Sequence, residues 1–160
     1  MEFTTADLCD AYPEAVQVAE PVFREYGGLA KFAGPIETLA VFEDNALVRQ
    51  TLETEGRGRV LVVDGSGSVR CALVGGRLAS LAHANGWAGL VLNGGVRDSA
   101  ELSQVAIGIR ALSTAPRRSG KTGTGRKGGT VTFAGVAFIP RAFLYADGDG
   151  LLVAERDLLS

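Results

Sequence analysis

Residues 72–102 read ALVGGRLASLAHANGWAGLVLNGGVRDSAEL, and this stretch decides the fold. The pair Gly75-Gly76 precedes an apolar run with helical spacing, and Leu90–Leu92 is a short continuous apolar run, typical of a strand covered on both faces. A helix followed by a buried strand is the repeat of a parallel sheet, in which ligands bind at the carboxyl ends of the strands. We therefore look for the functional site just after Leu92.

The start of the helix after Gly75-Gly76 is a candidate anion site. The first backbone N–H groups of a helix have no partner within the helix, and the helix dipole favours negative charge there. We expect these amides to be unpaired and able to hold a small anion such as a carboxylate.

Charged side chains follow the buried strand. Asn93-Gly94-Gly95 ends the apolar run, and Arg97, Asp98 and Glu101 come next. An arginine can bind a carboxylate or an enolate oxygen through two N–H groups, and an aspartate can hold Mg²⁺ through one oxygen while water and substrate complete the coordination. The alternative is a solvated loop in which Asp98 or Glu101 begins a helix over residues 99–105. Spacing alone leaves both interpretations open.

The spacing Gly76, twenty residues, Arg97-Asp98, two residues, Glu101 resembles the signature of the RraA-like family. This family includes 4-hydroxy-4-methyl-2-oxoglutarate/4-carboxy-4-hydroxy-2-oxoadipate aldolases and regulators of ribonuclease activity A. The similarity extends over nearly the whole chain, through Phe23–Gly28, Phe42–Asn45, Val60–Gly65, Tyr145–Asp147 and Asp149-Gly150. It implies an α/β fold with the swivelling β/β/α architecture, similar to phosphohistidine domains. It also implies a homo-oligomer, a trimer or hexamer, with sites between subunits.

The resemblance also implies a mechanism. In the similar aldolases a divalent metal on the aspartate chelates a 2-oxo acid, amides of the glycine-rich helix start hold its carboxylate, and the arginine faces the oxygen that becomes an enolate. Carried over to this chain, the metal ligand is Asp98 and the catalytic residues are Arg97 and Asp98, with Glu101 behind them. The substrate-binding residues are Gly75, Gly76, Arg77, Leu78 and Arg97, and the metal is Mg²⁺ or Mn²⁺.

The implied reaction is metal-dependent cleavage of 4-hydroxy-4-methyl-2-oxoglutarate-type 2-oxo acids to pyruvate. Cleaving a C–C bond next to a carbonyl leaves an electron pair that must become an enolate, and a cation beside a guanidinium stabilises that charge. The same groups would decarboxylate oxaloacetate, because loss of CO₂ forms the same pyruvate enolate. This chain departs from the pattern of the dedicated aldolases, which carry Asp at the position of Gly76.

The alternative function is that of a regulator that binds and inhibits an endoribonuclease of the RNase E type without catalysis. Regulator-type members of the family need no metal, so they need not keep a carboxylate after the arginine. This chain keeps both Asp98 and Glu101. We therefore expect an enzyme, with an endoribonuclease as a second candidate partner.

Composition bounds the class of protein. The 160 residues, 46% of them apolar, suffice for a single domain over residues 1–160 with a sizeable core. A net charge of −2 does not predict direct binding of nucleic acid. Cys9 and Cys71 are far apart, without metal-ligand spacing, which is typical of a reducing cytoplasm. We expect a cytoplasmic protein with no membrane partner, since no signal-peptide or membrane-spanning pattern occurs.

Other segments predict the remaining elements. Thr4 caps a short helix that Pro13 ends, and Asp44 caps a second helix. Residues 36–42 and 60–63 are expected strands, and the last third of the chain is expected to hold short strands only. This pattern predicts a sheet covered by helices on one side and by β structure on the other.

Residues 116–129 are expected to form a flexible basic loop. The segment carries Arg117, Arg118, Lys121, Arg126 and Lys127. It fits a relaxed Walker A pattern, but the glycines that follow make the required helix implausible. Three roles stay open: a solvated surface, contact with an anionic partner, or a lid over a dicarboxylate substrate.

Overall fold

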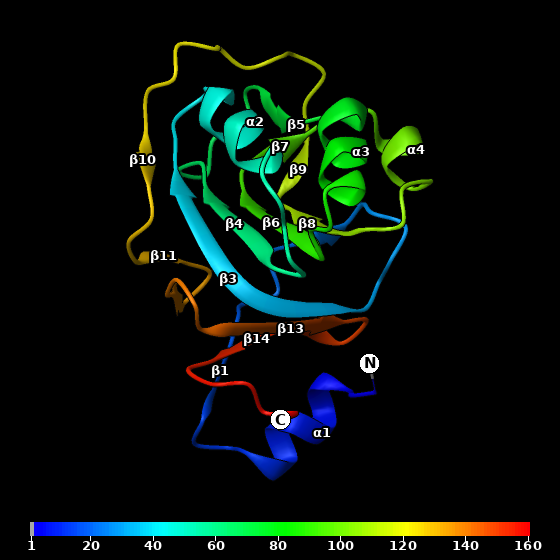
Figure 1. Ribbon diagram of the computed structural model, residues 1–160, viewed down its shortest axis with the longest axis vertical. Coiled ribbons are helices and arrows are strands. Elements are labelled where there is room, and N and C mark those ends of the chain that lie inside the picture. The colour runs from blue at the N-terminus through cyan, green and yellow to red at the C-terminus, as the bar shows by residue number, and fades with distance from the viewer. Residues whose placement is uncertain (1) are drawn as a thin grey trace.

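A mixed, strongly curved sheet runs through the computed structural model, which describes residues 2–160 (Figure 1). Nine strands form this sheet in the order β1-β14-β13-β3-β4-β6-β8-β2, with β10 paired to β3 outside that path. A three-stranded sheet, β5-β7-β9, and the hairpin β11-β12 complete the β structure. The helices are α1 Thr5–Ala11, α2 Ala46–Leu52, α3 Gly76–Ala84 and α4 Ser99–Leu102. The strands are β1 Val16–Val18, β2 Arg24–Glu25, β3 Phe32–Ala40, β4 Val60–Asp64, β5 Ala72–Val74, β6 Gly89–Asn93, β7 Gly95–Val96, β8 Gly108–Ala111, β9 Ser113–Thr114, β10 Arg126–Lys127, β11 Val131–Phe133, β12 Val136–Phe138, β13 Phe143–Asp147 and β14 Gly150–Ala154.

The long strand β3 joins a parallel half of the large sheet to an antiparallel half. Its first residues, Phe32–Pro35, pair antiparallel with β13, and its last, Ile36–Ala40, pair parallel with β4. Strands β4, β6 and β8 continue the parallel half, as the apolar runs in the sequence predict. The strand begins four residues before the predicted start at Ile36, because pairing with β13 supplies a partner that no local pattern reveals.

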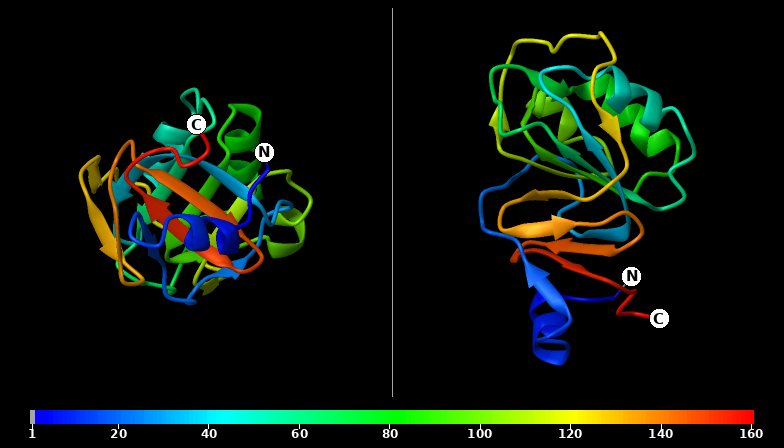
Figure 2. Two further views of the ribbon diagram at one scale, coloured as in Figure 1. Left: turned by 90° about the horizontal axis from the view of Figure 1, so that it is seen from below. Right: turned by 90° about the vertical axis from the view of Figure 1, so that its left-hand side faces the viewer.

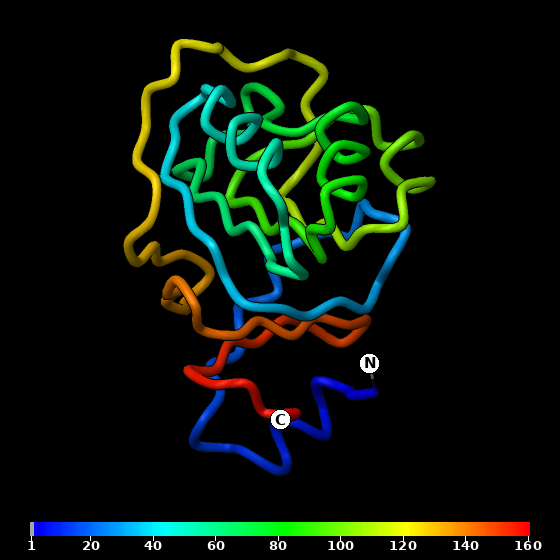
Figure 3. Tube along the Cα trace, in the orientation of Figure 1, coloured from blue at the N-terminus to red at the C-terminus, as the bar shows by residue number. Residues whose placement is uncertain are grey.

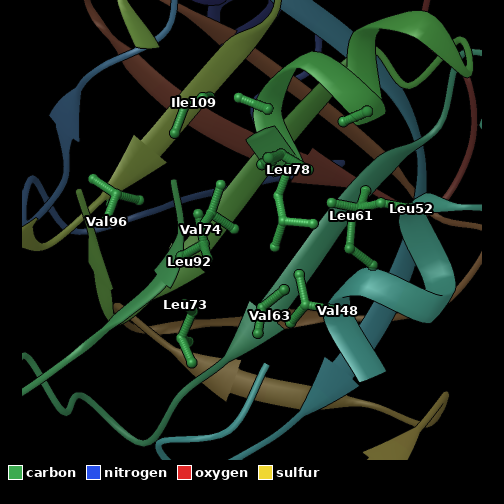
Figure 4. Close-up of a cluster of buried hydrophobic side chains, with 14 of the residues drawn as sticks. Val48, Leu52, Leu61, Val63, Leu73, Val74, Leu78, Leu92, Val96 and Ile109 are labelled. Atoms are coloured by element: carbon green, nitrogen blue, oxygen red, sulfur yellow. The ribbon is translucent and has the colours of Figure 1, made fainter. Parts of the chain in front are cut away.

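Different elements pack against the two faces of the large sheet. Leu61 and Val63 of β4 point into a cluster with α2 and α3 (Figure 4), whereas Val60 and Val62 pack with residues of β11 to β14. This alternation follows from the two-residue period of a strand. The predicted arrangement, with helices on one side and β structure on the other, is therefore confirmed.

Removing a side chain from the helix-side cluster should be costly. Leu92 of β6 is fully buried there, so we expect Leu92→Ala to lower the free energy of unfolding by about 2–5 kcal/mol. Leu29→Ala is the control, because Leu29 is 42% exposed and its loss should cost about 0.5 kcal/mol or less. Urea denaturation measures both free energies, and equal costs would contradict the burial of Leu92 in this cluster.

The amino-terminal helix packs against the antiparallel half, and both termini lie at that end of the molecule (Figure 2). Thr4 caps α1 as predicted, because its side-chain oxygen accepts a hydrogen bond from Asp7 N–H. Short strands occupy the last third of the chain, also as predicted.

The helix expected over residues 99–105 is shorter, and α4 covers only Ser99–Leu102. Within residues 2–160, no helix has the length and apolar character needed to cross a membrane.

Candidate functional site

A pocket of about 470 Å³ lies at the start of α3 and contains every predicted site residue. Gly75, Gly76, Arg77, Leu78, Arg97, Asp98 and Glu101 all line it. Four further residues complete the lining: Asn45, Arg49, Arg118 and Lys121. The structure thus gathers four segments of the chain around the helix start.

The small parallel sheet β5-β7-β9 positions the central residues. Gly75 follows β5, and Arg97 follows the neighbouring strand β7. A hydrogen bond of 3.0 Å from Arg97 N–H to Val74 C=O joins the two strand ends. The carboxyl ends of adjacent parallel strands therefore hold the site, as α/β sheets generally do. The strands that hold the site are β5 and β7 of this second sheet. The sequence had instead indicated a site directly after the apolar run that forms β6.

Asp98 occupies the helix start with its own carboxylate. Gly76 N–H donates to Asp98 Oδ2 at 2.9 Å. The expectation that all amides there are unpaired is therefore wrong for Gly76, because the negative charge favoured by a helix start is supplied within the chain. Asp98 also adopts the left-handed conformation, with φ 61° and ψ 44°. Backbone strain of this kind clusters at functional sites.

The carboxylate of Glu101 lies directly over Gly76. A Cβ atom added at Gly76 would be 1.6 Å from Glu101 Oε2, so only glycine permits this approach. A Cβ atom at Gly75 would likewise lie 2.7 Å from Asp98 Oδ2. The Glu101 carboxylate thus fills the space that a side chain at position 76 would take. Position 76 carries Gly and not the Asp of the aldolase pattern, but the carboxylate of Glu101 lies in the same part of the pocket.

Positive charge predominates in the rest of the pocket. Arg49, Arg77, Arg97, Arg118 and Lys121 line it together with only two carboxylates. Arg97 is half-buried, and its sole side-chain hydrogen bond within residues 2–160 is a long one, 3.4 Å, from Nη1 to Pro116 C=O. Lys121 Nζ donates to Asn45 Oδ1 at 3.3 Å. The pocket is therefore suited to a ligand with more than one anionic group.

Sequence reasoning did not select Asn45 and Arg49 as site residues. Asn45 is the N-cap residue of α2, which follows the carboxyl end of β3, and Arg49 lies within this helix. Their distance in sequence from residues 75–101 hides the contact. The segment Phe42–Asn45, quoted for its similarity to the family, was the signal that could have found Asn45.

The basic segment 116–129 is attached to the body of the protein, contrary to the expectation of a flexible loop. Gly120 N–H donates to Glu43 C=O, and Asn45 N–H donates to Gly120 C=O. Ala72 N–H donates to Arg117 C=O, and β10 pairs with the end of β3. Figure 3 shows the segment in yellow, running over the top of the molecule and down its left side. It forms no helix, so the Walker A interpretation is excluded as expected.

Asp44 differs from its predicted role as a helix cap. The N-cap residue of α2 is Asn45, and Asp44 accepts one hydrogen bond from Ala46 N–H at 3.1 Å. Its other bonds come from Thr122 and Gly123 in the basic segment. Burial acts to raise the pKa of Asp44, but these hydrogen bonds lower it to about 2. The side chain is therefore a charged link between the two segments.

The donor set at the helix start fits a hard divalent cation. Asp98 is exposed, and within residues 2–160 its Oδ1 accepts no hydrogen bond. Glu101 brings a second exposed carboxylate to the same pocket. Mg²⁺ is commonly bound through one or two carboxylates, with water and substrate oxygens completing the shell. In the described part of the chain, no cluster of three or more His, Cys, Asp or Glu side chains is placed to hold a metal.

Other candidate residues take structural roles. Asp64, the last residue of β4, accepts hydrogen bonds from Ser66 N–H and Asn93 Nδ2. Trp87 is 3% exposed and belongs to the helix-side cluster, whereas His83 is exposed on α3.

Comparison of the sequence with known proteins identifies the family of this chain. The family model for RraA-like proteins, described as aldolase/RraA, matches residues 5–153. A Burkholderia mallei protein is 53% identical over 164 residues, which cover 99% of each chain. Its name provisionally assigns it the activity of a 4-hydroxy-4-methyl-2-oxoglutarate aldolase.

Two solved structures are similar over nearly the whole chain. A Geobacillus kaustophilus protein, described as an S-adenosylmethionine:2-dimethylmenaquinone methyltransferase, is 50% identical with a TM-score of 0.96, over 98% of both chains. The RNA-processing inhibitor RraA from Thermus thermophilis is 51% identical with a TM-score of 0.94, over 98% of this chain and 94% of the other. The predicted α/β fold of RraA type is confirmed, and the chain belongs to the RraA-like family.

Proposed function

We propose that this protein is a divalent-metal-dependent lyase that cleaves 4-hydroxy-4-methyl-2-oxoglutarate-type 2-oxo acids to pyruvate and also decarboxylates oxaloacetate. The observation that carries the proposal is the placement of Asp98, Glu101 and Arg97 around the start of α3 in one pocket. The aldolase name of the Burkholderia relative supports the lyase class. Mg²⁺ or Mn²⁺ is the proposed cofactor, held by Asp98 with Glu101 nearby.

Different residues of the pocket would bind the two carboxylates of the substrate. Gly76 N–H is engaged by Asp98, so the amides of Arg77 and Leu78 are left to bind the carboxylate next to the 2-oxo group. Asn45 and Lys121, with Arg49 and Arg118, line the part of the pocket that would receive a second carboxylate. This assignment develops the lid role left open for the basic segment.

The chemical step needs a proton acceptor and stabilisation of an enolate. A bound divalent ion would act as a Lewis acid at the carbonyl oxygen of the substrate. Glu101 accepts the proton of the 4-hydroxyl group, the C3–C4 bond breaks, and its electron pair forms the pyruvate enolate. Arg97 stabilises the negative charge on the enolate oxygen as it develops. The other fragment leaves as the second carbonyl product, and Glu101 returns its proton to C3, which gives pyruvate and restores the carboxylate.

The test is pyruvate release by the purified protein, followed with lactate dehydrogenase. We expect release from 4-hydroxy-4-methyl-2-oxoglutarate and from oxaloacetate with Mg²⁺ or Mn²⁺, and loss of both activities in EDTA. Activity should return when excess metal is restored. Absence of release from both substrates with either metal would overturn the lyase proposal.

The proposed assembly is a cytoplasmic homo-oligomer, a trimer or hexamer, whose sites are completed between subunits. The support for this assembly is the membership of the chain in the RraA-like family. Light scattering at micromolar concentration should give a multiple of 16.6 kDa, and a species of that mass alone would contradict the assembly.

A second candidate function is binding and inhibition of an endoribonuclease. The observation that favours it is the 51% identity to the Thermus RNA-processing inhibitor.

If the basic segment binds an acidic partner, replacing Arg117, Arg118 and Lys121 with Ser should weaken association, most strongly at low salt where exposed charges are least screened. The control replaces Arg24, Arg141 and Arg156, which lie outside this segment. An unchanged affinity of the first variant for RNase E, measured by surface plasmon resonance, would contradict this role of the segment.

We base no proposal on the methyltransferase activity given for the Geobacillus protein. Glycine-rich loops after a strand can bind S-adenosylmethionine, and residues 64–68 form such a loop here. However, both backbone N–H groups of Gly65 and Gly67 donate to Asn93 C=O, and the Asp64 carboxylate is engaged as described.

A further inference from the structure

Asp44 accepts one hydrogen bond from the first residue of α2 and three from a distant segment. The residue is 3% exposed. Its Oδ2 accepts from Thr122 N–H at 2.5 Å and from Thr122 Oγ1 at 2.7 Å. Its Oδ1 accepts from Gly123 N–H and from Ala46 N–H, both at 3.1 Å. Both oxygens are therefore fully used, and three of the four donors belong to the basic segment, 78 or 79 residues away.

The residues that Asp44 holds are next to residues of the pocket. Lys121 directly precedes Thr122, and Asn45 directly follows Asp44. Lys121 and Asn45 both line the pocket and are joined by the hydrogen bond from Lys121 Nζ to Asn45 Oδ1. Thr122 itself is exposed, so no packing of its own side chain fixes its position. Lys121 is therefore held from both sides, by the backbone hydrogen bonds of Gly120 to Glu43 and Asn45 and by the link between Thr122 and Asp44.

We propose that Asp44 is a positioning residue that fixes Thr122 and Gly123, keeps Lys121 at the pocket, and so sets the affinity for a carboxylate remote from the 2-oxo group. Asp44 does not line the pocket and acts through Lys121. This role rests on the proposed function for its substrate class. It accounts for a buried charge that the chemical step does not use.

Asparagine is the informative replacement. It has nearly the shape of aspartate, but only one of its two polar atoms is an acceptor. Whichever way the amide is oriented, its NH₂ group faces two of the N–H or O–H donors that now bind a carboxylate oxygen. In either orientation at least one hydrogen bond to Thr122 or Gly123 is lost, so the link should weaken while the backbone contacts of Gly120 persist.

The matched control is Asp147→Asn. Asp147 is also buried, at 8% exposed, and also joins distant segments by accepting from Thr5 N–H and Thr5 Oγ1, both at 2.7 Å. It lies in the antiparallel half, outside the pocket. The control therefore separates a general loss of stability from a local effect on Lys121.

The binding test compares two 2-oxo acids in the presence of Mg²⁺ by isothermal titration calorimetry. One is 2-oxoglutarate, which carries a remote carboxylate and lacks the 4-hydroxyl needed for cleavage; the other is pyruvate, which has no remote carboxylate. We expect Asp44→Asn to weaken 2-oxoglutarate binding about tenfold, the effect of losing a charged hydrogen bond. Pyruvate binding should change less than about twofold, and Asp147→Asn should affect neither. Lys121→Ala should reproduce the selective loss, and adding Asp44→Asn to it should weaken binding no further.

A second test needs no ligand. Limited trypsin digestion, with fragments identified by mass spectrometry, should cut after residues of the segment 117–127 at least about tenfold faster in Asp44→Asn than in the unmodified protein. Asp147→Asn should leave this rate unchanged.

The outcomes separate the two proposals. If the unmodified protein binds both acids and Asp44→Asn weakens both equally or neither, the positioning role is overturned and the proposed function stands. Unchanged cleavage of the segment in Asp44→Asn also overturns it. If the unmodified protein binds neither acid, the proposed function fails and the substrate part of this proposal fails with it.

Discussion

Asp98→Asn should lower metal-dependent pyruvate release by at least about 100-fold, because it removes the negative charge that binds a hard cation at a site with few protein ligands. The fold should persist. Asparagine has the same size and tolerates the left-handed conformation observed at φ 61°. Its side-chain oxygen can still accept the hydrogen bond from Gly76 N–H. Because Asp98 is exposed, the free energy of unfolding should change by only about 0.5 kcal/mol.

The measurement is the pyruvate-release assay at saturating Mg²⁺, together with urea denaturation of the same preparation. Asp10→Asn is the control, since Asp10 is an exposed aspartate of α1, outside the pocket. Full activity of Asp98→Asn with metal would remove Asp98 from the metal site.

Arg97→Lys should lower kcat by about 100-fold or more, the usual cost of removing a donor to a developing oxyanion. KM should rise much less, because the charge on the enolate oxygen exists only late in the reaction. Lysine keeps the positive charge but loses the planar pair of N–H groups. The fold does not depend on this guanidinium, whose hydrogen bond to Pro116 C=O is 3.4 Å long.

Steady-state kinetics with 4-hydroxy-4-methyl-2-oxoglutarate measures this effect. Arg77→Lys is the matched control, because Arg77 lines the same pocket and the variant keeps its charge and its backbone amide. An unchanged kcat for Arg97→Lys, or a change in KM alone, would return Arg97 to a binding role.

The sequence predicts the elements whose signals are local. The apolar runs of β4 and β6 and the glycine pair at the start of α3 are read from single windows of the sequence. Burial on both faces of a strand and a helix start without a capping side chain of its own have direct residue signatures. Three charged residues could be selected because they follow the apolar run of β6 and because their spacing resembles that of a known family: Arg97, Asp98 and Glu101.

Features that depend on distant partners were beyond local reasoning. Strands β5, β7 and β9 have only two or three residues each, too few to show a period, and they exist because they pair with one another. Asp44 precedes a helix and so reads as a cap, although most of its hydrogen bonds go to Thr122 and Gly123. The approach of Glu101 to Gly76 likewise appears only in three dimensions.

The central claim is that the Asp98 carboxylate binds a divalent metal at the start of α3, and Mn²⁺ binding tests it most directly. Electron paramagnetic resonance of free Mn²⁺ measures the affinity of the protein without any substrate. The account predicts saturable binding by the unmodified protein and by Asp10→Asn, and binding weakened at least about tenfold in Asp98→Asn. Equal affinity of Asp98→Asn and the unmodified protein for Mn²⁺ would contradict the claim.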